Sequence, residues 1–562
     1  MKRTKVLFRI LKKQERCGDV KPYRIIIWIT AILLLLHPVD SASQSGLFFY
    51  RIYFKDKGRN LNAYQPAQLL SERAIARRIK NGVSYPDYRD FPVNNEYISA
   101  IKSRGFMLHV TSKWMNTALF SSNDISTASS LEDLPFVSRV EIVKYPVSGK
   151  KSADKFQDEF INKAPGGFDL PIRMVNGNVL HEAGYKGKNI LIAILDGGFV
   201  YADIIESLDP LRKRNGIKYT YDLVKNDKSV FESSDHGTAA LSILAGSMPG
   251  KIEGSAPDAE FLLLKTEDVL SEFPCEEDFW AAGAELADSA GADIISSSLG
   301  YSTFDDPSMN YSQADLDGNT AFVTQVADVA ASKGIAVFNS AGNERNNNWY
   351  KIVFPSDGDS VISVGAVDGN RLISNFSSAG FSADGRVKPD ITAMGVAVPI
   401  QTYPSAIITG NGTSFACPVM SGMAACLMQA VPEASSMEVL NAIKESSSMF
   451  NRPDYLYGYG IPDMGAAFKS LLEIHFRNPD DEVSVAPNPT SGSLHLVFSN
   501  SPGSFRLEIY SLNGKQILSK EYYANGKSVL IDDLANREQG FYIFKIITNE
   551  GTLVRRVIKL GK

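Results

Sequence analysis

The chain has 562 residues, 44% hydrophobic and 22% charged, a composition typical of globular protein. This length is too great for one ordinary core, so we expect several domains. Lysine and arginine number 58 against 63 acidic residues, a net charge of −5 that excludes the basic surface of a nucleic-acid-binding protein.

The N-terminus has the layout of a signal peptide, over residues 1–43. A basic stretch precedes the apolar run Ile25–Leu36, and small residues follow near Ser41–Ser43. The run is about twelve residues, shorter than the roughly 20 that a membrane span needs. A signal anchor is the alternative, and a misassigned start codon would also explain the long basic stretch.

Residues 46–145 are expected to form a small α+β domain. FFYRIYF, FMLHVTS and VSRVEIVKY predict strands, and SERAIARRIK predicts a helix that Ser71 begins. Residues 146–168 are polar and contain three glycines, which predicts a linker.

Residues 169–475 alternate short apolar strands with helical stretches. NILIAILD, AEFLLLKTE, ADIISSSLG, GIAVFNSAG and SVISVGAVD are the strands, and DFWAAGAELADSA is one of the helices. Such alternation indicates an α/β domain with a parallel sheet covered by helices on both faces. Sites in these sheets form at the carboxyl ends of the strands.

The segment 482–562 alternates apolar and polar residues between turns such as Asn513–Gly514. This pattern predicts a small antiparallel β-sandwich.

Four cysteines are too few for a disulfide scaffold. Cys417 and Cys426 lie nine residues apart in one predicted helix, or about 13 Å at 1.5 Å per residue, too far to bridge. We expect these and Cys275 to be buried thiols.

Three residues could together activate a nucleophile. Asp196 ends an apolar strand and precedes two glycines that allow a tight turn, and His236 precedes a helix of small residues. Ser414 lies at the start of a further helix, where developing negative charge is stabilised, and Pro418 is expected in its first turn. A serine hydroxyl is a poor nucleophile until a base takes its proton, and a neutral imidazole held by a carboxylate can be that base. Taken singly, each residue could instead be a helix cap or a structural side chain.

The segment from about Val175 to Phe468 resembles the subtilisin-like serine peptidases, the subtilases, because it carries six motifs in the order of that family. The motifs are Asp196, HGT at His236–Thr238, SSLG at Ser297–Gly300, SAGN at Ser340–Asn343, KPD at Lys388–Asp390 and GTSFACP at Gly412–Pro418. The resemblance implies a subtilisin-like fold and an Asp196, His236, Ser414 triad. Two departures are Gly197, where the pattern usually has Thr, and Ala239, where many members have a second His.

The resemblance also assigns substrate-binding residues. Asn343 would donate its side-chain amide to the oxyanion, together with the N–H of Ser414; a turn Asn is the alternative. The expected cleft residues are Ser298, Leu299 and Gly300, which would pair with the substrate backbone, and Ser340, Ala341 and Gly342. Gly300 and Gly342 are expected to leave room in the pocket for the residue before the scissile bond, which predicts a broad or a medium-large apolar preference.

No cofactor is expected. Acidic residues gather at Glu276–Asp278, Asp305–Asp306 and Asp315–Asp317, without EF-hand spacing, and we interpret them as solvated loops. Subtilases often bind structural calcium, but no ligand can be assigned. No zinc motif is present.

The flanking domains extend the resemblance. An α+β domain before the catalytic unit resembles a subtilase propeptide, which assists folding and inhibits the enzyme; a permanent accessory domain is the alternative. The C-terminal PNP at Pro487–Pro489, LNGK at Leu512–Lys515 and GFYIFKI at Gly540–Ile546 resemble the sorting domain of type IX secretion cargo. A generic Ig-like or carbohydrate-binding module is the alternative.

The sequence therefore predicts a monomeric, secreted or surface-bound serine endopeptidase, made as a self-inhibited precursor. Its expected partners are polypeptide substrates, its own propeptide and the secretion machinery. A catalytically silent subtilase-fold binding protein is the main alternative, and a peptidase with one processing target is another.

Overall fold

The structure is a computed structural model. It describes residues 46–58, 64–123, 129–146, 155–156, 167–404, 406–475, 482–511 and 514–560, and the backbone of 160–161. The expected signal peptide, residues 1–43, lies outside the described residues. Within the described part of the chain, no helix is both long and apolar enough to cross a membrane.

The N-terminal domain is an antiparallel four-stranded sheet with helices, as the sequence predicts. The strand order is β2-β3-β1-β4, and β1 pairs with both β3 and β4. Ser71 begins α4 by accepting a hydrogen bond from the N–H of Ala74 at 3.1 Å. The elements are β1 Phe48–Phe54, α3 Pro66–Leu69, α4 Glu72–Lys80, α5 Asn95–Lys102, β2 Met107–Ser112, β3 Thr117–Ser122, α6 Ser129–Glu132 and β4 Val137–Lys144.

The centre of the α/β domain, residues 169–475, is a seven-stranded parallel sheet, ordered β14-β13-β12-β11-β6-β10-β7. Its strands are β6 Leu191–Asp196, β7 Ile217–Asp222, β10 Glu260–Lys265, β11 Ile294–Ser297, β12 Ala336–Ser340, β13 Val361–Val367 and β14 Ile391–Met394. All residues of β6 are buried, as expected for a strand covered on both faces.

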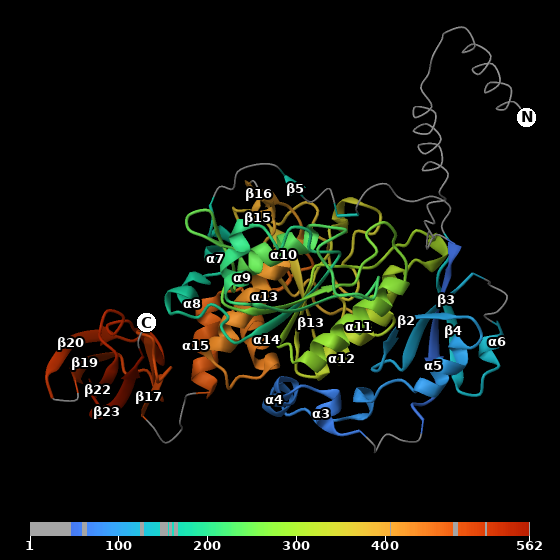
Figure 1. Ribbon diagram of the computed structural model, residues 1–562. Helices are drawn as coiled ribbons and strands as arrows, with labels where there is room; N and C mark the ends of the chain where they lie inside the picture. The colour runs from blue at the N-terminus through green and yellow to red at the C-terminus, as the bar shows by residue number, and fades with distance from the viewer. Residues whose placement is uncertain are drawn as a thin grey trace, which may run out of the picture. The chain divides into compact units, whose positions relative to one another are not determined.

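Helices cover both faces of this sheet. Ile192 and Ile194 of β6 belong to the apolar cluster that contains residues of α10 His236–Ala245 and α13 Thr413–Ala430. Leu191, Ala193 and Leu195 belong to the cluster with α11 Cys275–Ala290 and α12 Phe322–Ser332. Figure 1 shows the two helix pairs on opposite sides of β13. The remaining helices are α7 Leu170–Met174, α8 Asn178–Glu182, α9 Asp209–Lys213, α14 Ser436–Glu445 and α15 Met464–His475.

Pro418 lies in the interior of α13, and the expectation that it occupies the first turn is wrong. A proline there removes the N–H that would bond the carbonyl of Ser414, four residues earlier. The hydroxyl of Ser298 donates to that carbonyl at 2.7 Å. The chain thus satisfies the acceptor from a neighbouring loop. Cys417 and Cys426 both lie in α13 and, like Cys275, are free and buried, as expected.

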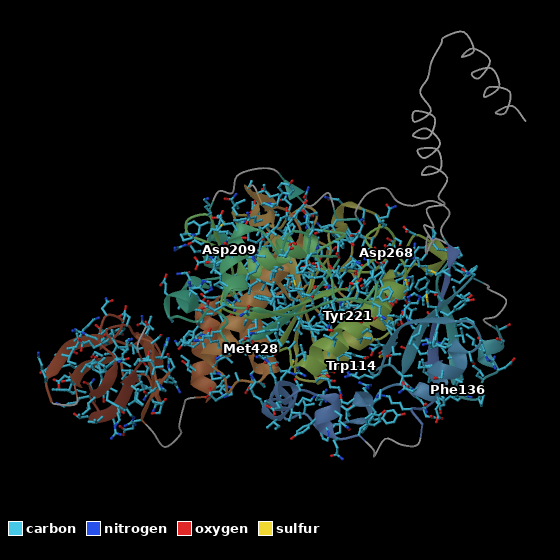
Figure 2. All side chains as sticks on the ribbon, in the orientation of Figure 1. Trp114, Phe136, Asp209, Tyr221, Asp268 and Met428 are labelled. Atoms are coloured by element: carbon cyan, nitrogen blue, oxygen red, sulfur yellow. The ribbon has the colours of Figure 1, made fainter. Side chains whose placement is uncertain are left out.

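The N-terminal domain packs on α11. Trp114, labelled in Figure 2, is buried in the same apolar cluster as Trp280 and Ala284 of that helix. The carboxylate of Glu285 accepts from the hydroxyl of Ser112 at 2.6 Å and from the N–H of Trp114 at 2.9 Å. The helix therefore offers the domain both an apolar surface and a buried acceptor.

The segment expected to be a linker contains a short strand. β5, Phe160–Ile161, pairs with β16, Ala406–Gly410, which also pairs with β15, Val398–Tyr403. The backbone register places Phe160 opposite Gly410, four residues before Ser414. A two-stranded sheet is formed by β8 Ser247–Met248 and β9 Ile252–Glu253.

The C-terminal domain consists of two antiparallel sheets, as predicted. One has the order β17-β18-β21 and the other β20-β19-β22-β23. Side chains from both sheets, including Leu496 and Phe544, share one apolar cluster. The strands are β17 Val483–Ala486, β18 Leu494–Phe498, β19 Ser504–Ser511, β20 Gln516–Tyr523, β21 Ser528–Ile531, β22 Gly540–Ile547 and β23 Thr552–Lys559.

Candidate active site

Asp196 and His236 form a buried pair at the carboxyl edge of the sheet. Asp196 is the last residue of β6, and His236 is the first residue of α10. Nδ1 of His236 lies 2.7 Å from Oδ1 of Asp196, and both side chains are fully buried. A carboxylate at this position accepts a hydrogen bond from Nδ1–H, which leaves Nε2 as the basic nitrogen of the ring.

The two glycines after Asp196 admit neighbouring groups, as expected. A Cβ atom on Gly198 would lie 2.6 Å from the carbonyl of Glu232, in the segment that leads to His236. The φ of Gly198 is +149°, which also favours glycine. The turn therefore brings the histidine segment against the end of β6.

Ser414 is the second residue of α13 and lines a cavity of about 660 Å³. The same cavity is lined by Phe156, whose ring stacks on His236, and the next residue of the helix, Phe415, has its ring 5.9 Å from that of His236. The structure thus brings the three predicted residues to one site. Because the first N–H groups of a helix have no partner within the helix, negative charge is stabilised at this end of α13.

Asn343 follows β12 and lines the same cavity. Its Oδ1 accepts hydrogen bonds from the N–H and the hydroxyl of Thr413, at 3.0 and 3.1 Å. Because Thr413 engages the oxygen, Nδ2 is the atom of this amide that can donate to a substrate oxyanion. Asn343 is thereby fixed to the residue that precedes Ser414.

Five of the six predicted cleft residues line the cavity: Ser298, Leu299, Gly300, Ser340 and Gly342. Ala341 does not; it is buried in the cluster beneath the cleft, and its N–H donates to Val364. The two glycines do not enlarge the pocket as expected. A Cβ atom added to Gly300 would lie 2.1 Å from the side chain of Val353, and one added to Gly342 would lie 2.9 Å from it. The apolar preference remains a prediction.

Phe156, in the expected linker, lies directly on the pair of Asp196 and His236. Its ring stacks on His236 with centroids 4.3 Å apart and planes at 20°. A Cβ on Gly197 would lie 2.6 Å from this ring. The departure from the usual Thr therefore leaves room for the aromatic side chain. Sequence reasoning missed this contact, although the glycine at 197 was a signal of it.

Lys155 fills an acidic pocket beside the cleft. Its Nζ lies 2.6 Å from Glu267, 2.7 Å from Glu272 and 3.1 Å from Glu276. Burial alone would lower the pKa of Lys155, but the three carboxylates hold it well above its usual value. The N–H of Lys155 also donates to the carbonyl of Val269 at 3.2 Å, so its backbone is bound to the wall of the cleft.

The interpretation of Glu276–Asp278 as a solvated loop is wrong. All three residues are buried in the first turn of α11. Arg51 of the N-terminal domain donates to Asp278 at 2.7 Å and lies 3.3 Å from Glu277. The cations that allow this burial come from residues more than 100 positions earlier, which a local pattern does not reveal.

Comparison with known proteins agrees with this geometry. The profile of the subtilase family, Peptidase S8, matches residues 187–460. The profile of the Peptidase S8 propeptide domain of Bacteroidota matches residues 49–158, and that of the secretion system C-terminal sorting domain matches residues 484–560.

Individual proteins are also similar. Subtilisin E of Bacillus subtilis (strain 168) is 30% identical over 333 residues, 58% of this chain and 77% of that protein. Subtilisin DY of Bacillus licheniformis is 31% identical over 300 residues, 53% of this chain and 97% of that protein. A structure of the MycP3 protease from the type VII (ESX-3) secretion system covers 57% of this chain and 93% of its own, at 20% identity and a TM-score of 0.44.

The matched segments coincide with the three structural regions described above. The chain belongs to the subtilase family and is a subtilisin-like serine peptidase with a propeptide domain and a secretion sorting domain.

Proposed function

We propose that this peptidase cleaves polypeptides through Asp196, His236 and Ser414. The 2.7 Å contact between Asp196 and Nδ1 of His236 carries the proposal, because it leaves Nε2 to act as base. Oγ of Ser414 attacks the scissile carbonyl as Nε2 takes its proton, and the same proton then passes to the leaving amine. Water hydrolyses the acyl-enzyme by the reverse sequence.

The oxyanion of each tetrahedral intermediate would receive hydrogen bonds from two groups. Nδ2 of Asn343 is one, because Thr413 engages the other end of that amide. The N–H of Ser414, in the first turn of α13, is the other. Donors held in place before the reaction stabilise the charge as it forms. We propose that this chemistry needs no cofactor.

The precursor would be inhibited by its own chain. Phe156 covers His236 and Lys155 is bound in the cleft, so a substrate cannot take their place. Four peptide bonds separate Phe156 from Phe160, whose backbone pairs with Gly410 next to the serine segment. We place the processing bond among these four, an interval in which the propeptide match also ends.

The processing bond is tested by the intact mass of the mature enzyme. An N-terminus at residue 157, 158, 159 or 160 supports the assignment. Cleavage elsewhere, or cleavage that persists in a Ser414→Ala precursor purified alone, contradicts self-processing across this cleft.

The sorting domain indicates export to the cell surface or the medium. We propose a route with signal-peptide export first and type IX secretion second, after which the enzyme acts as a monomer. Deleting residues 482–562 should then retain the protein inside the cell envelope. Equal amounts of truncated and full-length protein outside the cell would contradict this route.

A fluorescent fluorophosphonate tests the catalytic assignment directly, because it reacts with a serine that a base has activated. Mature wild type should be labelled and Ser414→Ala should not. An unlabelled mature wild type would favour a silent binding protein. Digestion of several unfolded proteins then separates a general peptidase, with many cuts, from an enzyme with one processing target.

A further inference from the structure

One wall of the catalytic cleft carries three carboxylates that converge. Glu267, Glu272 and Glu276 each place an oxygen within 4.8 Å of the others. Glu267 and Glu272 line the same cavity as Ser414, and Glu276 lies beneath them, fully buried. Three like charges in a site of this size repel one another unless a cation or protons are present.

Two of the three carboxylates, those of Glu267 and Glu276, are held by the catalytic domain itself. The hydroxyl of Tyr301 donates to Glu267 at 2.6 Å. The N–H groups of Asp268 and Phe273 donate to the two oxygens of Glu276, at 2.8 and 3.1 Å. None of these donors belongs to the propeptide, so Glu267 and Glu276 keep these hydrogen bonds after the propeptide is removed.

The group that fills this pocket in the precursor is a lysine ammonium. Nζ of Lys155 contacts all three carboxylates between 2.6 and 3.1 Å. Lys155 directly precedes Phe156, the residue stacked on His236, and both residues line the cavity that Ser414 also lines. Lys155 thus shows that a lysine side chain can reach this pocket from a peptide bound in the cleft.

We propose that Glu267, Glu272 and Glu276 form a substrate subsite that selects a lysine on the amino-terminal side of the scissile bond. Lys155 occupies this subsite in the precursor. The position of the lysine follows from the processing interval: it is between the second and the fifth residue before the cleaved bond. This inference rests on the proposed peptidase function and names part of its substrate.

The test uses mature enzyme and two internally quenched peptides with the sequence of residues 153–161. One retains the lysine and the other has norleucine, which keeps the chain length and removes the charge. A charge-assisted contact in a water-poor pocket should make kcat/KM about tenfold or more higher for the lysine peptide. The assay is run both with EDTA and with Ca²⁺, so that competition by a metal for the carboxylates is measured and loss of a structural ion is not mistaken for loss of function.

Variants of the enzyme test whether the three carboxylates cause the preference for the lysine peptide. Glu272→Gln and Glu267→Gln should each reduce the lysine-to-norleucine ratio severalfold. Glu344→Gln is the matched control, because Glu344 lines the same cavity but makes no contact with Lys155. It removes the same charge and should keep the ratio.

The outcomes separate this inference from the proposed function. A ratio near one with active wild type overturns the subsite and leaves the peptidase intact. A ratio near one, together with Ca²⁺ stabilisation that Glu272→Gln and Glu267→Gln abolish, makes the three carboxylates a metal site and also overturns it. If neither peptide is hydrolysed, the proposed function fails, and equilibrium binding of the same peptides to wild type still decides the subsite.

Discussion

The hydroxyl of Ser298 donates a 2.7 Å hydrogen bond to the carbonyl of Ser414. This bond replaces the one that Pro418 cannot make inside α13, and it ties the loop after β11 to Ser414, the proposed nucleophile. The position of Ser414 therefore depends on a side chain of the loop that is expected to bind substrate.

Removing this hydroxyl should affect both stability and catalysis. Ser298→Ala leaves a buried carbonyl without its side-chain donor, which costs about 1–3 kcal/mol of unfolding free energy. We expect kcat to fall severalfold because Ser414 is less firmly placed. Denaturant unfolding of the Ser414→Ala precursor with and without Ser298→Ala measures the first effect. An unchanged unfolding free energy would show that another donor, or water, satisfies the carbonyl.

The second prediction concerns Asn343. Asn343→Ala removes both the amide donor and the acceptor for Thr413. We expect kcat to fall about 10²- to 10³-fold, the loss known for such a donor in subtilisin itself, with a smaller change in KM. Asn343→Asp is the informative companion, since it keeps an acceptor for Thr413 and places a negative charge beside the oxyanion. Peptide-hydrolysis kinetics of the mature variants measure both, and comparable kcat in wild type and Asn343→Ala would exclude the oxyanion role.

The third prediction concerns the contact between Gly197 and Phe156. A methyl group at position 197 would occupy the place of the Phe156 ring. Gly197→Ala should therefore weaken the hold of the propeptide on the site and slow self-cleavage of the precursor severalfold, because the processing bond must be held in the site to be cut. The mature enzyme should retain its activity, because the subtilase pattern usually carries a side chain at this position.

Conversion is followed by gel or mass spectrometry. Phe156→Ala should have a similar effect, and the double variant should add little, because both changes remove one contact. Gly369→Ala is the control, because its added methyl group would lie 3.6 Å from the side chain of Leu170, an ordinary van der Waals distance. Fully additive effects of the two substitutions would show that Gly197 and Phe156 act independently.

Strong local signals explain what the sequence could predict. The buried strand that ends at Asp196, the small-residue helix after His236 and the motif at Ser414 identify the sheet, its covering helices and the catalytic edge. The Ser71 helix cap was predictable for the same reason. Each of these features is fixed by residues close together in the chain.

The missed features join distant residues. Lys155 meets carboxylates more than 100 positions later, and Arg51 meets Asp278, so their burial was hidden from a local pattern. Pro418 was misplaced by a few residues because the start of a helix is poorly marked in sequence. The space at Gly300 is taken by Val353, which only the packed structure reveals.

The last prediction concerns pH and the contact between Arg51 and α11. Burial raises the pKa of Glu277 to about 7, although Arg51 and a hydrogen bond from the hydroxyl of Tyr311 oppose the rise. The neighbouring carboxylates of Asp278 and Glu141 add to it. A glutamate in an unfolded chain titrates near about 4.3. The folded precursor therefore holds the Glu277 proton more tightly than the unfolded chain does.

The sign of the pH dependence follows from this difference. The stabilisation that Glu277 contributes is complete below about pH 4.3 and is lost as the pH rises through about 7. Unfolding of the Ser414→Ala precursor, with and without Glu277→Gln, isolates this group from all others that titrate. The free-energy difference between the two proteins should shift against the Glu277 form between pH 4 and 8, by at most about 1.4 kcal/mol per pH unit. A difference that is constant over this range would mean that Glu277 stays ionised beside Arg51.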